Sequence, residues 1–114
     1  MSVAELFNGL AITDHAKTAQ YEIAEHLRSK GYTVVLEHPV PDAGNGTSGR
    51  IDIIATRKNE RLAIEVDRSS PRDKSMFKLK SMSGYTPIVL LRNGNYNFIR
   101  DSVIIYSLTL KESL

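Results

Sequence analysis

The sequence predicts an α/β protein in which helices flank a central mixed β-sheet, and three observations support this prediction. The chain has 114 residues, of which 41% are hydrophobic and 25% are charged, a balance typical of globular proteins. Helix-like and strand-like segments follow one another in the order helix, three strands, helix, strand, strand. Residues 87–91 form a continuous apolar run, as expected of a strand covered on both faces. We therefore expect one domain that spans residues 1–114.

The N-terminal region predicts two helices. A short helix is expected within residues 3–10. A longer helix follows from about residue 14 to residue 30, with Thr13 as its N-cap and Gly31 just beyond its end. Its apolar residues recur at intervals of three and four, which predicts one buried stripe made of Ala16, Ala19, Ile23 and Leu27.

The rest of the chain predicts a further helix and five strands. Ser70, Pro71 and Asp73 provide a capping hydroxyl, a first-turn proline and a first-turn acid, so this helix is expected to begin here and to end before Gly84. The strands are expected at residues 32–40, 50–56, 61–67, 87–91 and 103–108. Residues 57–60 join the second and third of these strands as the turn of a hairpin.

Composition excludes several classes of protein. The chain contains no cysteine, which excludes disulfide scaffolds, thiolate zinc sites and cysteine nucleophiles. No apolar run approaches the ~18 residues that a membrane-spanning helix needs. The N-terminus lacks the basic start and apolar stretch of a signal peptide. We expect a cytoplasmic protein with no membrane partner and no organic cofactor.

Positive charge is concentrated in the middle of the chain. Residues 50–80 contain nine basic and five acidic side chains, a net charge of +4, whereas the whole chain carries +2. A basic middle segment suits a phosphate-rich ligand such as DNA. A solvated charged surface explains the same count equally well.

The hairpin carries the most specific chemical signal. If its turn is centred between Lys58 and Asn59, then Asp52 lies directly opposite Glu65, because residue numbers of cross-strand partners sum to 117 in that register. Directly opposed side chains of like charge destabilise a sheet. Asp67 lies two residues after Glu65 and so shares its face.

A divalent cation would explain this cluster of acids. Mg²⁺ takes oxygen ligands and needs only one or two carboxylates in addition to phosphate and water. Two alternatives stay open: a surface hairpin whose acids face solvent, and a hairpin register shifted by one residue, which would separate the pair.

The long helix offers a fourth acid. Glu22 lies about 60° from Ala19 around the helix, at the rim of the apolar stripe, so it is expected to point toward the Asp52–Glu65 pair. Glu25 falls on the solvent side. His26 lies one turn from Glu22, but two ligands without a third do not establish a zinc site.

The arrangement of helix, acidic hairpin and helix resembles the PD-(D/E)XK nuclease superfamily, in particular its small Holliday-junction-resolvase-like members. The segments that carry the resemblance are Gly49-Arg50-Ile51-Asp52-Ile53-Ile54, Ala63-Ile64-Glu65-Val66-Asp67 and Tyr21-Glu22. The resemblance spans residues 14–92 and implies a restriction-endonuclease-like core.

One position departs from the pattern of this superfamily. Its usual lysine, two residues after the second acid, is replaced by Asp67. In some members the lysine has migrated to the next helix, where Lys74 and Lys78 lie one turn apart. Their angular position is opposite Met76 and Leu79, so we expect both lysines outside the core. A solvated basic face is the alternative for either lysine, and Arg68 is a third candidate for the missing cation.

The resemblance implies a Mg²⁺-dependent endonuclease that hydrolyses DNA phosphodiester bonds in recombination or repair, with Mn²⁺ as a substitute ion. Branched DNA such as a Holliday junction is the substrate it implies. The implied metal ligands are Asp52, Glu65 and the backbone carbonyl of Val66. The full set of expected catalytic residues is Glu22, Asp52, Glu65, Asp67, Lys74 and Lys78, and the expected DNA-binding residues are Arg50, Arg68, Arg72, Lys74 and Lys78.

Two other hypotheses compete with the nuclease. One is a catalytically inactive module that keeps the nuclease fold for DNA binding or assembly, which the replacement of the lysine by Asp67 favours. The other is an unrelated α/β protein with an accidental acid cluster. Symmetric cleavage of both DNA strands needs two sites, so the nuclease hypothesis also predicts a homodimer.

Overall fold

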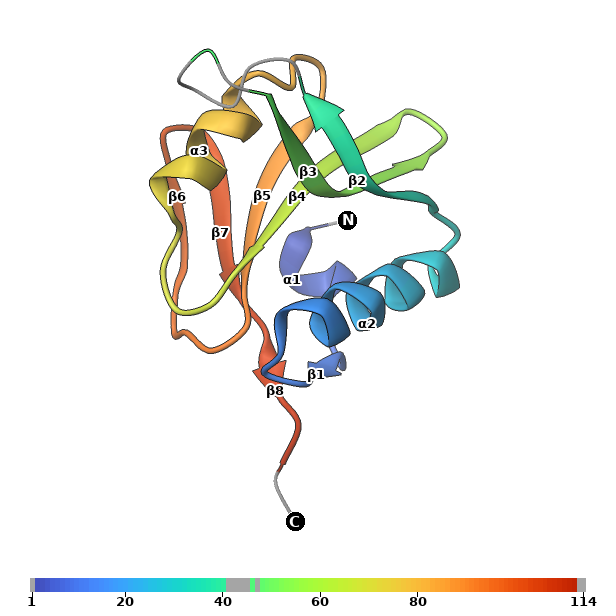
Figure 1. The fold of residues 1–114 in the computed structure, drawn as a ribbon. Coiled ribbons are helices and arrows are strands. Elements are labelled where there is room, and N and C mark those ends of the chain that lie inside the picture. The colour runs from blue at the N-terminus through green and yellow to red at the C-terminus, as the bar shows by residue number, and fades with distance from the viewer. Residues whose placement is uncertain (1, 41–45, 47, 113–114) are drawn as a thin grey trace.

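The computed structural model describes residues 2–40, 46 and 48–112 (Figure 1). The helices are α1 (Val3–Leu6), α2 (Ala16–Ser29) and α3 (Asp73–Lys80). The strands are β1 (Ala11–Ile12), β2 (Thr33–Val40), β3 (Gly49–Arg57), β4 (Glu60–Asp67), β5 (Thr86–Leu91), β6 (Asn97–Arg100), β7 (Val103–Ser107) and β8 (Thr109–Leu110). This order contains the predicted elements and three additional short strands, β1, β6 and β8.

Six strands form the central sheet in the order β2-β3-β4-β5-β7-β6. The strands β2, β3 and β4 pair antiparallel, whereas β4, β5 and β7 pair parallel, and β6 pairs antiparallel with β7. The parallel connection from β4 to β5 passes through α3, as a parallel pair requires a long crossover. The predicted mixed sheet flanked by helices is therefore confirmed.

Helices cover both faces of this sheet (Figure 1). Ala19, Ile23 and Leu27 of the predicted stripe are buried against one face, in a core that also contains residues of β3, β4 and β5 and Leu6 and Phe7 from the N-terminal region. Ala16, the first residue of that stripe, is exposed, contrary to the prediction. The other face packs against α3 through Met76 and Leu79. Burying each of these large side chains contributes about 1.5–3 kcal/mol, which fixes both helices on the sheet.

The start of α2 differs from the prediction. His15, not Thr13, is its N-cap, and the His15 ring nitrogen Nδ1 accepts a hydrogen bond from the Thr18 backbone N–H. Thr13 instead donates its backbone N–H to Glu22, and this bond orients the chain just before the helix. None of the helices in the described ranges is long and apolar enough to span a bilayer.

The start of α3 also differs. The helix begins at Asp73 with Arg72 as N-cap, two residues later than the Ser70-Pro71 signal predicts. Arg72 provides no side-chain cap, and the carboxylate of Asp67 accepts its backbone N–H instead. The strand β6 was not predicted because all four of its residues are exposed and show no apolar alternation.

Candidate active site

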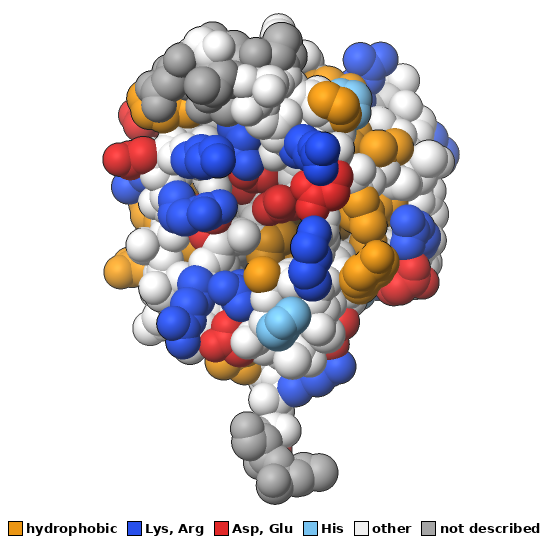
Figure 2. Space-filling model, viewed as in Figure 1, with side chains coloured by type: hydrophobic (Ala, Val, Ile, Leu, Met, Phe, Trp, Pro, Cys, Tyr) orange, Lys and Arg blue, Asp and Glu red, His pale blue; other side chains and the backbone are white. Residues whose placement is uncertain are grey.

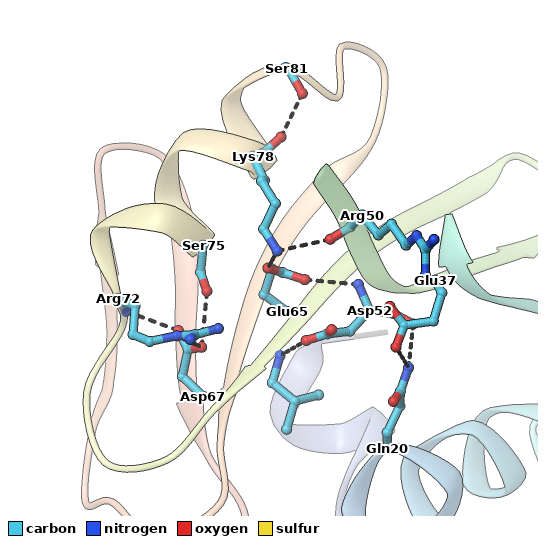
Figure 3. Close-up of polar contacts among 11 residues, drawn as sticks. Gln20, Glu37, Arg50, Asp52, Glu65, Asp67, Arg72, Ser75, Lys78 and Ser81 are labelled. Atoms are coloured by element: carbon cyan, nitrogen blue, oxygen red, sulfur yellow. Dashed lines mark hydrogen bonds and ion pairs between the residues drawn. The ribbon is translucent and has the colours of Figure 1, made fainter. Parts of the chain in front are cut away.

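The β3–β4 hairpin has the predicted register. Its strand pairs run from Arg57↔Glu60 to Ile53↔Ile64, and each pair of residue numbers sums to 117. One step further, where Asp52 and Glu65 face each other, side chains replace the regular ladder. The Asp52 backbone N–H donates to Glu65 Oε2 at 2.8 Å, and the Val66 N–H donates to Asp52 Oδ2 at 2.9 Å (Figure 3). Each acid therefore binds the backbone of the opposite strand, which brings both carboxylates into one site.

The sheet is also interrupted on the other side of Asp52. The β2–β3 pairs Leu36↔Ile53 and His38↔Ile51 leave out the step between them, where Glu37 has a φ of 54°. That conformation is uncommon for a residue with a side chain. The Asp52 carbonyl accepts a hydrogen bond from Gln20 Nε2 of α2 at 2.8 Å. Side chains thus satisfy both backbone groups of Asp52, as in distorted strands next to functional sites.

The alternation of β3 breaks at the same residue. Ile51 belongs to the core beneath α3, whereas Ile53 belongs to the core beneath α2, although residues two apart in a regular strand share a face. Asp52 lies at the crossing point between the two faces. This position places the Asp52 carbonyl within reach of Gln20 on α2, while Glu65 beside it is within reach of Lys78 on α3.

Lys78 provides the positive charge of the site. Its ammonium forms an ion pair with Glu65 Oε1 and donates a hydrogen bond to the Arg50 carbonyl at 2.8 Å (Figure 3). Lys78 is only 6% exposed and Glu65 is fully buried. The expectation that Lys78 lies outside the core is therefore wrong. Lys78 lies on the buried side of α3, one turn from the small Ser75. The four-carbon stem of Lys78 carries its ammonium inward to the carboxylate of Glu65.

Burial raises the pKa of Glu65 to about 7, and the charge of Asp52 acts in the same direction, while Lys78 opposes both. Burial likewise raises the pKa of Asp52, and the charge of Glu37 adds to this effect. The main cause for both acids is that burial disfavours the charged form of a carboxylate. A cation brought to the site would favour the ionised form of both acids.

The raised pKa of Glu65 predicts a pH-dependent stability. The folded protein keeps a proton on Glu65 that the unfolded chain loses near its ordinary pKa of 4.5. This stabilising contribution is complete below pH 4.5 and is lost as the pH rises through about 7, so the free energy of unfolding should fall across that window. Urea titrations should show a flatter pH dependence for Glu65→Gln than for wild type. Identical slopes for the two proteins would contradict the assignment.

Three residues of the site, Lys17, Gln20 and Glu37, were not predicted from the sequence. Gln20 donates to the Glu37 carboxylate as well as to the Asp52 carbonyl, and Lys17 forms an ion pair with Glu37 at 3.1 Å. Burial would raise the pKa of Glu37, but the hydrogen bonds from Lys17 and Gln20 outweigh it and lower that pKa. Gln20 carried a signal, because it is a polar residue in the middle of the apolar stripe of α2. Glu37 carried none.

These residues surround a pocket of about 150 Å³ at the surface. Its lining is formed by Ala16, Lys17, Gln20, Glu37, Asp52, Val66 and Arg72. A water molecule occupies ~30 Å³ in the liquid, so the pocket has room for a hydrated ion or for one phosphate group with water.

The donor set of this pocket fits Mg²⁺ by its chemistry. Within the described ranges, no three His, Asp or Glu side chains are grouped as ligands of one metal ion. Mg²⁺ does not require such a group, because it keeps several waters and is bound through one or two carboxylates. Asp52 and Val66 line the pocket, and the buried Glu65 lies directly behind Asp52. The oxygens available are hard ligands of the kind this ion prefers.

Asp67 has a structural role that differs from the predicted one. Its carboxylate is 2% exposed and accepts three hydrogen bonds of 2.9 Å, from the Arg72 N–H, the Arg72 Nε and the Ser75 hydroxyl (Figure 3). These bonds cap the N-terminus of α3. Asp67 shares the face of Glu65 as its parity predicts, but its oxygens are directed to α3 and not to the pocket.

Removing this cap should destabilise the fold. We expect Asp67→Ala to lower the free energy of unfolding by about 1–3 kcal/mol, because the buried Ser75 hydroxyl and the Arg72 N–H lose their acceptor. Asp73→Ala is the matched control, since Asp73 is an exposed acid in the first turn of the same helix and should contribute less than about 1 kcal/mol. Chemical denaturation compares the two. Equal losses in both variants would mean that Asp67 is not the cap.

Glu22 lies elsewhere, contrary to the prediction. Its carboxylate binds the Thr13 backbone N–H at 2.8 Å and forms an ion pair with Lys111, which follows β8. These contacts tie α2 to the small β1–β8 pair, and the hydrogen bonds together with Lys111 lower the pKa of Glu22 despite partial burial. Glu25 is exposed, as predicted, and it forms an ion pair with Arg28. The helix residue that reaches Asp52 is Gln20, not Glu22.

The predicted DNA-binding residues lie at the surface with one exception. Arg50, Arg68, Arg72 and Lys74 are exposed, whereas Lys78 is buried in the site. Arg72 is held by Asp67, and Arg68 lies 3.9 Å from Asp14. Figure 2 shows carboxylates in the middle of one face with lysine and arginine side chains around them. The centre of this face is acidic and its rim is basic.

Comparisons with known proteins support the fold alone. No protein-family model matches the chain, and no curated protein sequence matches it. The chain is similar to a crystal structure described as a "Protein of Unknown Function AF1548", with a TM-score of 0.54 and 18% sequence identity. The match covers 77% of this chain and 55% of that one, so the chain spans about half the length of that structure.

Proposed function

We propose that the protein is a Mg²⁺-dependent endodeoxyribonuclease with a restriction-endonuclease-like core formed by α2, β2, β3, β4, α3 and β5. The observation that carries the proposal is the meeting of Asp52, Glu65 and Lys78 in one site. A pair of opposed acids with a lysine matches the chemistry of the PD-(D/E)XK nucleases that the sequence resembles. In this chain the lysine comes from α3 instead of the strand position that Asp67 occupies.

The buried charges favour a functional role over a structural one. An ion pair removed from water contributes little net stability, because desolvation offsets its attraction. A second acid beside that pair adds repulsion, because burial and then the charge of Asp52 raise the pKa of Glu65. Folding alone gives no reason to place Asp52 here, whereas a cation bound at the pocket would offset its charge.

The residues of the site would have different roles in the cleavage reaction. Asp52, Glu65 and the Val66 carbonyl would hold the ion. Bound there, Mg²⁺ supplies a polarised phosphate oxygen and a water of lowered pKa for in-line attack. Lys78 would place a positive charge beside the phosphate, where negative charge develops in the transition state. Gln20 would position Asp52 by its hydrogen bond to the Asp52 backbone carbonyl.

DNA would approach over the basic rim. Lys17 and Arg72 line the pocket, and the charge of Arg50 acts on Glu37, which also lines it. All three cations are exposed, so their charges are available to backbone phosphates. The acidic centre alone would repel DNA, and the bound cation would lower that repulsion. Cleavage of both strands of a symmetric substrate would use a homodimer.

The proposal is tested by incubating the wild-type protein with linear, nicked, single-stranded and branched DNA in Mg²⁺ or Mn²⁺. We expect cleavage that EDTA abolishes. DNA binding without cleavage in either metal, on every substrate, would refute the nuclease and support the inactive DNA-binding module.

One observation favours that second candidate. Each acid already has protein partners, since Asp52 Oδ2 takes the Val66 N–H and Glu65 is bound by the Asp52 N–H and by Lys78. A site that is complete in this way can persist without metal. Calorimetric titration with Mn²⁺ separates the candidates, because the inactive module needs no metal affinity.

A further inference from the structure

The outward face of α3 exposes an aromatic ring between two lysines. Lys74, Phe77 and Lys80 are all exposed, and the Lys80 ammonium lies 5.7 Å from the centroid of the Phe77 ring. Phe77 is 48% exposed, and the buried side of the helix is formed by other residues. The fold therefore does not require an aromatic side chain at position 77.

Around the helix, this face begins next to the residue of α3 that enters the candidate active site. Lys78 enters the site from α3, and at about 100° per residue Lys74 lies about 40° from it around the helix. Phe77 lies about 100° from Lys78 in the same direction. A strand whose phosphate is beside Lys78 can therefore continue over Lys74 to the ring.

A hollow of about 390 Å³ adjoins the ring, between α3 and the turn that joins β6 to β7. It is lined by Asp73, Met76, Phe77, Lys80, Arg100 and Asp101. Its volume lies within the ~300–1,000 Å³ typical of small-ligand pockets. Met76 and Phe77 offer apolar contact to a planar ring. Asp73 and Asp101 can accept hydrogen bonds from the exocyclic amino groups of a nucleobase. Lys80 and Arg100 can contact phosphate or carbonyl oxygens.

We propose that this hollow binds one unpaired nucleobase of the DNA substrate, stacked on Phe77. The inference rests on the proposed function and specifies its substrate class: DNA with an unpaired base close to the scissile phosphate, such as a fork, flap or junction, in preference to intact duplex. Stacking on an aromatic side chain is independent of base sequence, because every base has a π-face. Charge complementarity supports DNA as the occupant, since lysines flank the ring on the path to the site.

The test is DNA binding by fluorescence anisotropy in Ca²⁺, an oxygen-binding cation that offsets the acidic centre, with a gel of each sample to confirm that the probes stay uncut. The probes are a labelled splayed-arm DNA and a fully paired duplex of the same length. We expect Phe77→Ala to weaken binding of the splayed-arm DNA about tenfold, as expected for loss of one stacked base, and to change duplex binding less than twofold. Phe77→Tyr should bind as wild type does.

Tyr96→Ala is the matched control, because Tyr96 is also 48% exposed but packs edge-on against Phe98 and is remote in sequence from α3. It should leave both affinities unchanged. Circular dichroism should show that all variants are folded, as expected for an exposed position.

The proposal is overturned if Phe77→Ala weakens both probes equally or neither, or if it changes only the oligomeric state, which would make the face a contact between two copies. Absence of binding by the wild-type protein overturns it as well. Splayed-arm binding that depends on Phe77 without any cleavage in Mg²⁺ refutes the nuclease alone. Cleavage by a Phe77→Ala variant with unchanged preference refutes the stacking alone.

Discussion

Asp52→Asn is expected to abolish metal-dependent DNA cleavage without unfolding the protein. An amide carries no charge with which to hold a cation, so the single-turnover rate should fall by at least ~10²–10³, the cost of losing one group that stabilises transition-state charge. The amide oxygen can still accept the Val66 N–H, which preserves the hairpin. Removing a buried charge next to Glu65 should hold or raise the melting temperature measured without metal.

The measurement is single-turnover cleavage of the best substrate, paired with calorimetric titration of Mn²⁺ in the absence of DNA. Glu25→Gln is the matched control, since it makes the same change of charge at an exposed acid that pairs with Arg28 outside the site. Its rate and metal affinity should equal those of wild type. Cleavage at the wild-type rate by Asp52→Asn would remove Asp52 from the ligand set.

Glu65 is a less informative position for this experiment. Its removal would leave the ammonium of Lys78 buried without a carboxylate partner, and breaking a buried ion pair costs about 3–5 kcal/mol. The hairpin alone suggests that deleting either acid relieves repulsion, but the contact with Lys78 reverses that expectation for Glu65. Loss of activity in Glu65→Ala would therefore not separate catalysis from unfolding.

The sequence was sufficient to predict what depends on local periodicity. The turn at residues 57–60 sets the hairpin register, and a strand period of two then places Asp52 opposite Glu65. The buried part of the apolar stripe of α2, formed by Ala19, Ile23 and Leu27, was predictable for the same reason, because its spacing repeats from one helical turn to the next. Both features depend on neighbours close in the sequence.

The errors concern contacts between elements distant in the sequence. Glu22 was placed correctly at the rim of the stripe, but periodicity does not show which element that rim meets. It meets Thr13 and Lys111, beside strands of two residues that leave no pattern in the sequence. Asp67 was placed on the correct face. Its oxygens cap a helix because α3 packs with its N-terminus next to Asp67, and the sequence does not show where α3 packs.

Lys78 shows the limit of reasoning from residue type. A lysine outside the apolar stripe of a helix is usually at the surface, and Lys74 is indeed exposed. The two lysines lie one turn apart on α3 and differ because Glu65, which is fully buried, is within reach of only one of them. Lys78 is buried because its ion-pair partner Glu65 is buried, and Glu65 belongs to β4, a different element from α3.

Lys78→Met should lower the single-turnover rate at saturating DNA by ~10²–10³, because methionine keeps most of the unbranched side chain but removes the charge beside the scissile phosphate. Lys74→Met is the matched control on the same helix, and its rate should stay within a few-fold of wild type. If Lys74 contacts phosphate, that variant should instead bind DNA more weakly and with a smaller salt dependence. Rate and affinity therefore separate the two lysines.

The stability of Lys78→Met provides an independent readout of the same contact. Without the ammonium, the buried carboxylate of Glu65 has lost its charged partner, which should cost about 3–5 kcal/mol where Glu65 is ionised. Lys78 lowers the pKa of Glu65, so without Lys78 the carboxyl group takes up a proton at a higher pH, and much of that loss should disappear at low pH. Denaturation of both variants at pH 5.5 and pH 8.5 measures this difference. If the rate of Lys78→Met stays within a few-fold of wild type while its stability falls as expected, then Lys78 neutralises a buried acid and takes no part in catalysis.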